Sequence, residues 1–507
     1  MTDRTPVTPS QLEAVHAYVS TARWFGGKGR DCRVVDVRRV AVLEGPEPAP
    51  RVGIELVTLS YAGGPDDPDT AVVETYQLPL AYYREEQERI GHALVGTWDD
   101  PELGPVRAYD ALHDREATVL WLQAFAQAEG GTEGESSPHA VGDLTFHRLP
   151  GHELDLDVHS TLFSGEQSNS SLLFGDDALM KVFRKVTPGD NPDIVIHRAL
   201  TEQGSDHVAA LYGWLELAVP DSDEPVQLAM LQQFLRTASD GWGLALASVR
   251  DLFAEADLRA DEVGGDFAGE AERLGLATAQ VHDVLAASFP TRSWGPEDLD
   301  RLSEAMLARL DDALTVVPGL AEHADRLRAT FSGVAELGRV VGNATAQRVH
   351  GDFHLGQTLR TVKGWKIVDF EGEPAKPLHE RVEPDLVWRD VAGMLRSFDY
   401  AAHAVIDDFN ADEQANRQIA FRAKEWLERN QTAYLRGYTD NSGKTDGNGL
   451  STHQQTILQD YIADKAVYEA VYETRNRPTW LPIPLGAIAR LTQADLDTTV
   501  SNPEAPA

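Results

Sequence analysis

Alternating apolar and polar positions run through the first hundred residues and predict strands with one buried face. Turns rich in glycine and proline separate these stretches. Ahead of them, a short helix is expected, with Ser10 as its candidate N-cap, and a helical run is expected from Arg107 to Phe125. Residues 1–105 are therefore predicted to form a small α/β domain, which we call the cap. Its expected strands are Val35 to Leu43, Arg51 to Tyr61 and Ala71 to Leu78.

Shorter strand-like runs follow from Asp143, and after Thr237 the spacing becomes helical. The strands expected are Leu144 to Leu149, Ser171 to Phe174, Leu179 to Phe183 and Val226 to Leu235, with a hairpin turn at Gly175-Asp176-Asp177 and one helix near Asp193 to Gln203. Seven helices are then expected: Gly241 to Leu258, Asp266 to Ala287, Pro296 to Thr315, Leu320 to Val341, Trp388 to Ala404, Asn416 to Tyr438 and His453 to Thr474. A frayed tail is expected from Thr498. This order predicts an α+β chain with domains at 1–105, 106–235 and 236–500.

Composition and charge narrow the class of protein. The 507 residues are 42% apolar and 25% charged, which is ordinary for globular proteins. A formal net charge of −36 disfavours nucleic acid and anionic membranes as partners. The single cysteine, Cys32, allows no internal disulfide and favours a reducing compartment. Because neither an apolar leader nor a long uncharged apolar run is found, a soluble, cytoplasmic protein is expected.

One segment, Val349 to Glu373 (VHGDFHLGQTLRTVKGWKIVDFEGE), combines the groups that phosphoryl transfer needs. Asp352 can orient the acceptor hydroxyl or take its proton. Gln357 and Asp369 offer the hard oxygen ligands that Mg²⁺ prefers, and Glu371 is a possible further ligand. The pattern H-G-D-x-H-x-x-Q, followed by a strand and D-F-E, is much more specific than any one of these residues.

This segment resembles the aminoglycoside phosphotransferase-like, protein-kinase-like superfamily, and bacterial maltokinases in particular. Gln357 stands where the superfamily usually has Asn. Further segments agree in order, including RWFGGKGR, GEQSNSSLLF, RDVAGMLRSFDYA and DKAVYEAVYETRNRPTWLPIPL. The resemblance implies a bilobal kinase-like fold behind the cap and the use of ATP and Mg²⁺. It further implies phosphorylation of maltose at its anomeric hydroxyl to maltose 1-phosphate, for α-1,4-glucan (glycogen) synthesis, and possible association with other trehalose- and maltose-to-glucan enzymes.

The nucleotide site is expected around a polar loop between two strands. Residues Gln167, Ser168, Asn169 and Ser170 would hold phosphates, although this loop lacks the Walker pattern and would, as a bare sequence, be read as a polar turn. By resemblance, Lys181 would reach the α- and β-phosphates, and Gln233 and Leu235 would face the adenine. Asp193 and Glu202 are both candidates to pair with Lys181, and the sequence leaves this choice open.

The acceptor sugar is expected at the C-terminal helix. Lys465, Tyr468 and Tyr472 share one helix face, a spacing that by itself favours core packing. The maltokinase resemblance favours sugar binding instead, with His354 and Glu469 as further contacts. Glucosamine or an aminoglycoside is the alternative acceptor if the acidic side chains of this helix, Asp464, Glu469 and Glu473, face inward, and Trp388 could reshape the pocket. A catalytically silent kinase-like binding protein is disfavoured because Asp352, Asp369 and Lys181 are all present.

Overall fold

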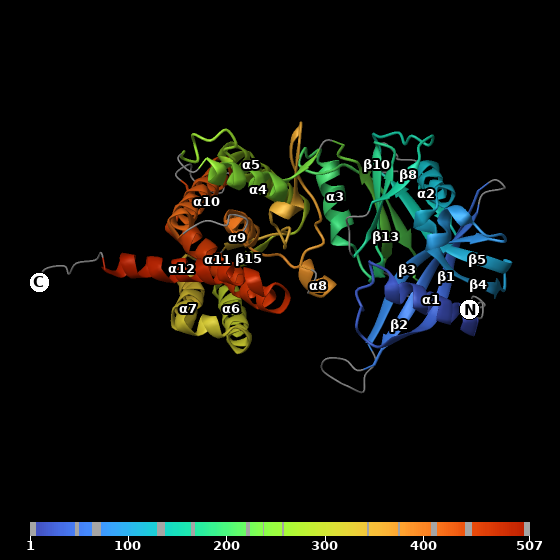
Figure 1. Cartoon of the computed structure of the whole chain (residues 1–507), viewed down its shortest axis with the longest axis horizontal. Helices are drawn as coiled ribbons and strands as arrows, with labels where there is room; N and C mark the ends of the chain where they lie inside the picture. Colours follow the sequence, from blue (N-terminus) through green and yellow to red (C-terminus); the bar gives the residue numbers. More distant parts are fainter. Residues whose placement is uncertain are drawn as a thin grey trace, which may run out of the picture. The chain divides into compact units, whose positions relative to one another are not determined.

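The structure is a computed structural model, and Figure 1 labels its helices and strands. The chain divides into two compact units, Met1–Arg198 with Ala209–Arg236 and Ala199–Val208 with Thr237–Ala507. Each unit is described by itself. The described residues are 7–45, 50–62, 72–128, 137–163, 168–219, 224–236, 238–255, 258–341, 344–373, 376–406, 413–441 and 449–500.

The cap is an antiparallel sheet with one helix on it. The strand order is β1-β2-β3-β5-β4, made by β1 (Cys32–Glu44), β2 (Arg51–Tyr61), β3 (Val72–Tyr83), β5 (Gly104–Asp110) and β4 (Leu94–Asp100). Helix α1 (Pro9–Thr21) begins after Thr8, whose hydroxyl accepts a hydrogen bond from the Gln11 N–H. The N-cap is therefore Thr8 and not Ser10, because Pro9 fits the first helical position and starts the helix one residue earlier.

The helix expected to begin at Arg107 begins only at Arg115, because a strand occupies its expected first residues. Residues Gly104–Asp110 form β5, and the helix α2 covers only Arg115–Gln127. Asp114 ends the irregular stretch by capping α2 through the Glu116 N–H. The predicted boundary between residues 105 and 106 falls within β5, so both sides of it belong to the cap sheet; the division into three domains stays a prediction.

A second antiparallel sheet follows in the same unit. Its order is β6-β7-β12-β13-β10-β9-β8, made by β6 (His139–Val141), β7 (Leu144–Arg148), β12 (Leu211–Leu217), β13 (Val226–Gln233), β10 (Ala178–Val182), β9 (Ser170–Phe174) and β8 (Ser160–Phe163). The predicted hairpin joins β9 to β10, and Gly175 adopts the positive φ of 56° that the turn requires. Helix α3 (Pro192–Glu202) matches its prediction closely, whereas β12 was not predicted.

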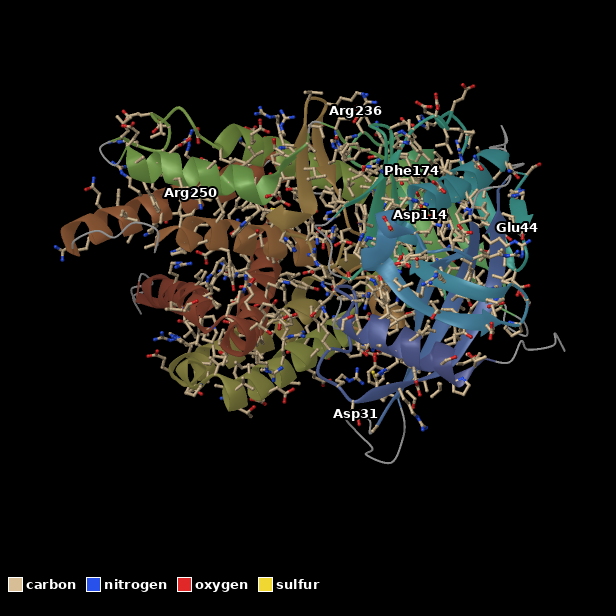
Figure 2. All side chains as sticks on the ribbon, turned by 45° about the vertical axis from the view of Figure 1, so that its right-hand side comes forward. Asp31, Glu44, Asp114, Phe174, Arg236 and Arg250 are labelled. Carbon is tan, nitrogen blue, oxygen red and sulfur yellow. The ribbon has the colours of Figure 1, made fainter. Side chains whose placement is uncertain are left out.

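The two sheets share one apolar core. Trp121 and Phe125 of α2, side chains of β1 and β2, and Phe174 of β9 are all buried in it. The short strand β11 (Lys185–Val186), which follows β10, pairs with β3 of the cap sheet. Figure 2 labels Phe174 and Asp114 within this unit. The cap sheet therefore packs against the second sheet, and its strand β3 is also hydrogen-bonded to β11, the strand that follows β10.

The second unit is mostly helical, as predicted. Its helices are α4 (Gly241–Ala254), α5 (Ala268–Ser288), α6 (Pro296–Val316), α7 (Ala324–Val341), α8 (Leu378–Arg381), α9 (Trp388–Ala404), α10 (Glu413–Asn441), α11 (Thr452–Asn476) and α12 (Pro482–Val500). A small sheet, β14-β17-β18, contains Ser239–Asp240, Thr358–Thr361 and Gly364–Ile367, and β15 (Arg292–Trp294) pairs with β16 (Ala344–Ala346). Helix α12 was not predicted; it continues to Val500, and the rest of the tail lies outside the described residues.

Two glycines let α5 and α10 approach closely. A Cβ added at Gly275 would lie 2.1 Å from the Tyr434 carbonyl oxygen, and one at Gly437 would lie 1.9 Å from that of Glu272. Helix α9 is the most enclosed helix of this unit, with nearly every side chain buried from Trp388 to Ala402. Across the described helices, none has the length and apolar character needed to cross a membrane.

Candidate active site

The loop that carries Asp352 is held by a buried carboxylate of α9. Asp390 accepts hydrogen bonds from the His350 N–H at 2.7 Å and from the Gly351 N–H at 2.9 Å. His282 of α5 lies 3.0 Å from the same carboxylate. Burial raises the pKa of Asp390, but the contacts with His282, His350 and the Gly351 N–H outweigh it and leave the pKa below its usual value. Asp390 therefore fixes the backbone next to Asp352 as an ionised acceptor.

The support behind Asp390 extends through α5 and α10. His282 Nδ1 lies 2.9 Å from the Tyr438 hydroxyl, and Gln347 Nε2 donates to the His282 carbonyl at 2.7 Å. All of these side chains are buried. From the sequence, Asp390 was expected only to be an acid at a helix start, and neither His282 nor Tyr438 was a candidate. Both lie more than 50 residues from the Asp352 loop along the chain, so no local pattern links them to it.

Asp352 is paired with the C-terminal helix. Lys465 Nζ of α11 lies 3.3 Å from Asp352 Oδ1, and 26% of the Asp352 side chain remains exposed. Burial raises the pKa of Asp352, but Lys465, His354 and His350 together bring it below its usual value. His354 caps the short turn after the loop by accepting the Gly356 N–H at 3.1 Å, and burial lowers the pKa of its imidazole. Asp352 is therefore an ionised, partly accessible base beside a neutral histidine.

The predicted metal ligands lie together near β18. Gln357 Nε2 donates to Asp369 Oδ2 at 3.0 Å, and an oxygen of Asp369 lies within 4.8 Å of one of Glu371. Asp369 has a φ of 66°, a left-handed conformation that a side chain other than glycine rarely adopts. Two carboxylates and an amide supply hard oxygen donors, so these residues fit Mg²⁺.

A pocket of about 750 Å³ adjoins Asp352 within the second unit. Lys465 Nζ lies 5.1 Å from the ring centre of Tyr468, and the Arg477 guanidinium lies 4.5 Å from that of Trp480. The lining residues are Asp240, Trp242, Asp352, His354, Gly356, Gly393, Ser397, Tyr400, Lys465, Tyr468, Glu469, Tyr472, Glu473, Arg477 and Trp480. The face of α11 with Lys465, Tyr468 and Tyr472 thus lines a pocket and is not core packing.

The acidic residues of α11 are paired with cations. Glu469 lies 2.7 Å from Arg396, and Glu473 lies 2.7 Å from Arg477. Asp464 lies 2.7 Å from Arg309 and does not line the pocket. The alternative acceptor was expected if these carboxylates face inward: Glu469 and Glu473 do line the pocket, each with a cationic partner, and Asp464 does not.

Trp388 lies in the core and does not shape the pocket. Only 6% of its surface is exposed, and its ring packs against Tyr438 with a centre-to-centre distance of 6.1 Å. It is absent from the residues that line the pocket. The expectation that Trp388 reshapes the acceptor site is therefore wrong, because the first turn of α9 points this side chain toward α10.

In the first unit, Lys181 of β10 pairs with Asp193 of α3, one of the two acids that the sequence offered. The Nζ–Oδ2 distance is 3.0 Å, and His197 Nδ1 lies 3.1 Å from the other carboxylate oxygen. Both members of the Lys181–Asp193 pair are buried. Burial raises the pKa of Asp193, but Lys181 and His197 together hold it well below its usual value. The choice that the sequence left open is thus resolved.

The other predicted nucleotide contacts are dispersed along the second sheet. Ser168 is exposed, Asn169 is half-buried, and Ser170 is buried with its hydroxyl accepting from Arg184 Nε at 2.8 Å. Gln233 ends β13 and Leu235 follows it, both half-buried. Gln167 lies outside the described residues. The Ser170 side chain is therefore engaged by the protein itself.

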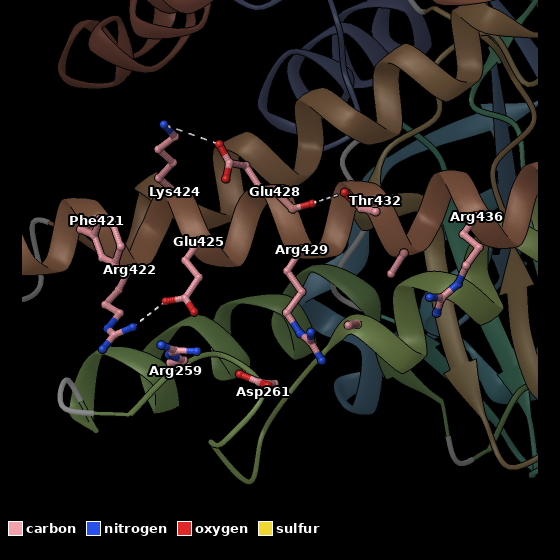
Figure 3. A pocket seen from close by; sticks show the side chains of 12 residues that line it. Arg259, Asp261, Phe421, Arg422, Lys424, Glu425, Glu428, Arg429, Thr432 and Arg436 are labelled. Atoms are coloured by element: carbon pink, nitrogen blue, oxygen red, sulfur yellow. Dashed lines mark hydrogen bonds and ion pairs between the residues drawn. The ribbon is translucent and has the colours of Figure 1, made fainter. Parts of the chain in front are cut away.

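A second hollow, of about 920 Å³, lies between α10 and the segment before α5 (Figure 3). Its charged side chains are largely paired: Arg422 lies 2.6 Å from Glu425, Lys424 lies 3.6 Å from Glu428, and Arg429 lies 2.6 Å from Asp266. These pairs fit a role in the packing of α10, so the pocket beside Asp352 is the candidate active site.

The chain is similar to known proteins in part of its sequence and in its fold. A family model described as the maltokinase N-terminal cap domain matches residues 18–114. A glucosamine kinase of Streptacidiphilus jiangxiensis is 29% identical over 326 residues, covering 63% of this chain and 70% of that protein. One from Mycolicibacterium smegmatis (strain ATCC 700084 / mc(2)155) is 28% identical over 66% of this chain and 79% of its own length. A solved structure of glucosamine kinase in complex with glucosamine, ADP and inorganic phosphate superposes with a TM-score of 0.65 at 22% identity, covering 96% of this chain and 100% of that one.

The fold and the cap together define a kinase-like protein with an N-terminal cap domain. The chain is similar to maltokinases in its cap and to glucosamine kinases over a longer stretch, which confirms the resemblance to the aminoglycoside phosphotransferase-like, protein-kinase-like superfamily. The predicted α+β, kinase-like fold class is likewise confirmed.

Proposed function

We propose that this protein phosphorylates a sugar hydroxyl with ATP and Mg²⁺, and that its acceptor is maltose, which becomes maltose 1-phosphate. The observation that carries the proposal is the pocket beside Asp352, whose carboxylates from α11 already have cationic partners. The maltokinase-type cap supports the same acceptor. A role of the product in α-1,4-glucan synthesis, and association with enzymes of that route, remain predictions from the resemblance.

Asp352 would act on the acceptor hydroxyl. Its pKa is lowered, so the carboxylate is ionised at neutral pH and can orient the hydroxyl and accept its proton. As the bond between the new oxygen and phosphorus forms, the bond to the ADP oxygen breaks, and the acceptor proton passes to Asp352. Lys465 would neutralise the carboxylate before transfer and hold it toward the pocket.

The nucleotide would be bound by the predicted metal ligands and by the predicted phosphate and adenine contacts. Gln357, Asp369 and Glu371 would hold Mg²⁺, which neutralises charge on the phosphates. Lys181, oriented by Asp193, would contact the phosphates. The remaining proposed contacts are Gln167, Ser168, Asn169, the backbone N–H of Ser170, and the chain at Gln233 and Leu235 beside the adenine.

The charge pairs of the pocket favour a neutral acceptor. An amino sugar carries an ammonium that needs an uncompensated carboxylate when it leaves water. Asp352, Glu469 and Glu473 each have a cation within 3.3 Å. The rings of Tyr468 and Tyr472 can instead stack on sugar faces and offer hydroxyls, and the volume lies within the range of small-ligand sites. His354 would be a further hydrogen-bonding contact.

Glucosamine is the second candidate acceptor. The relatives matched over 63% and 66% of the chain are named glucosamine kinases, and Asp240 adds a fourth carboxylate to the pocket lining. Asp240 caps α4 by accepting the Trp242 and Gly243 N–H groups and has no ion pair with a cation among the described residues. It is the residue through which an ammonium could be recognised.

A coupled ADP-release assay with MgATP tests the proposal against maltose, glucose, glucosamine and kanamycin. We expect turnover on maltose and little on the others. Turnover on glucosamine that is abolished by Asp240→Asn, with maltose inactive, would replace the acceptor and keep the chemistry. Silence on all four sugars, with MgADP still bound, would contradict the kinase assignment and favour a binding protein.

A further inference from the structure

Arg184 joins the cap to the strands of the predicted nucleotide site. It is 1% exposed and follows β10 closely, three residues after Lys181. Its Nη2 donates to Asp110 Oδ2 at 2.9 Å, and its Nε donates to Ser170 Oγ at 2.8 Å. One planar guanidinium thus ties a cap residue to the first residue of β9.

On the cap side, polar and aromatic side chains of the cap surround the Arg184 guanidinium. Tyr18 of α1 donates to the same Asp110 oxygen at 3.1 Å, and the Arg184 guanidinium carbon lies 4.6 Å from the ring centre of Trp24. Arg184 Nη1 has no hydrogen-bond partner among the described residues. Among the described residues, Asp110 is the one carboxylate that pairs with Arg184, and a buried cation depends strongly on such a partner.

On the other side, the chain that carries Lys181 is held by the cap over several residues. The Gln77 N–H donates to the Arg184 carbonyl at 2.7 Å, and Lys185 and Val186 pair with Tyr76 and Thr75 of β3. Across the hairpin, Lys181 is opposite Ser171, so Ser170 and Lys181 lie on the two adjacent strands β9 and β10. Displacement of Arg184 would move both strands.

We propose that Arg184, charge-paired with Asp110 of the cap, is a positioning residue for nucleotide binding: through Ser170 and β10 it sets the place of the phosphate-binding loop and of Lys181. This inference rests on the proposed function, in which the nucleotide phosphates lie at this hairpin. The cap is then part of the nucleotide site and not an appended domain. A cation that follows β10 in the chain and bonds to both β9 and the cap transmits a change in the cap directly to Lys181.

The test compares two buried aspartates of the cap. Asp110→Asn removes the charge that holds Arg184. Asp100→Asn is the matched control, because Asp100 is also buried, lies 2.7 Å from an arginine (Arg39), and accepts backbone N–H groups, but contacts only the cap. Full-length variants are titrated with MgADP by calorimetry and assayed for KM of ATP, KM of sugar and kcat. Arg184→Lys serves as a second variant, since lysine keeps the charge but cannot bond to Asp110 and Ser170 in the same fork.

Asp110→Asn is expected to raise the Kd for MgADP and the KM for ATP about tenfold, equivalent to about 1.4 kcal/mol, with the sugar KM unchanged. Arg184→Lys is expected to raise both by a smaller factor, and Asp100→Asn to lower thermal stability with nucleotide affinity unchanged. Equal effects of both aspartate variants on nucleotide affinity, or an unchanged Kd in Arg184→Lys, would overturn the inference. If Asp110→Asn does not fold, the Kd for MgADP of Arg184→Lys tests the inference. The titration needs no sugar: a wild-type protein that binds MgADP but phosphorylates no sugar contradicts the proposed function alone.

Discussion

Replacement of Asp390 by asparagine should show whether Asp390 positions the Asp352 loop in addition to stabilising the fold. The carboxylate accepts from the His350 N–H at 2.7 Å, from the Gly351 N–H at 2.9 Å and from His282 at 3.0 Å. An asparagine has one amide nitrogen in place of an oxygen, so at least one of these donors would face another donor. Hydrogen bonds to a charged group contribute about 1.5–3 kcal/mol each. We expect Asp390→Asn to cost at least that much, or about 3–12 °C in Tm.

The same substitution should also slow the reaction. Asp352 is the residue after Gly351, and a shift of about 1 Å in a catalytic group can cost about 100-fold in rate. The predicted result is a loss of this size in kcat at a temperature where circular dichroism shows the variant to be folded. Asp114→Asn is the control, since Asp114 is fully buried and also accepts from a backbone N–H (Glu116), an arginine (Arg89) and a tyrosine (Tyr83), all within the first unit.

The pH dependence of the stability loss gives an independent check. The pKa of Asp390 is lowered on folding, so its stabilisation is complete above the unfolded value of about 3.9 and disappears as the pH falls through the folded pKa. The Tm difference between wild type and Asp390→Asn should therefore shrink in acid. If Asp390→Asn keeps kcat within about twofold of wild type while it loses as much Tm as Asp114→Asn, the positioning role of Asp390 is refuted.

Three further predictions concern charged groups of the site. Asp352→Ala should lower kcat by about 10²–10⁴-fold with an unchanged Tm, and near wild-type turnover would remove Asp352 from the mechanism. Lys465→Met takes away the cation that lowers the Asp352 pKa, so the acid limb of the kcat/KM profile should move to higher pH; an unmoved limb would show that Asp352 does not titrate there. Asp193→Asn removes the carboxylate that lies 3.0 Å from Lys181 Nζ and should raise KM for ATP about tenfold with the sugar KM unchanged, which initial rates at varied ATP and sugar would measure. A rise confined to the sugar KM would contradict this assignment.

Much of the fold could be predicted because its signals are local. The alternation in β2 and the helical spacing of α9 match the observed Arg51–Tyr61 and Trp388–Ala404 end to end. The errors arise where contacts with residues distant in sequence override the local preference for a helix or a strand. Arg107–Asp110 is compatible with a helix by spacing, but β3 and β4 offer it strand pairing on both sides. Strand β12 was missed although it is almost continuously apolar, as expected for a strand between two neighbours.

The site was predictable to the extent that its residues are close in sequence. Gln357 and Asp369 are 12 residues apart, as are Lys181 and Asp193, and both pairs were among the candidates. Asp390 and the loop that it holds are separated by about 40 residues, and Arg184 and Asp110 by 74. Nothing in the local pattern of either segment encodes such a contact, because a buried aspartate and a solvent-facing one have the same sequence signature.

The same limit explains why the acceptor could not be derived from the acidic residues of α11. By sequence alone, Asp464, Glu469 and Glu473 would suit an ammonium if they faced inward. In the structure, each lies within 2.7 Å of an arginine, and the partners of Asp464 and Glu469 come from other helices, 155 and 73 residues away. A carboxylate that is already paired attracts a second cation only weakly, since the first has satisfied most of its charge and hydrogen-bonding capacity. The charge that these acids offer to a ligand thus depends on their ion pairs and not on their number, and this is the ground on which we propose a neutral sugar for a chain with a net charge of −36.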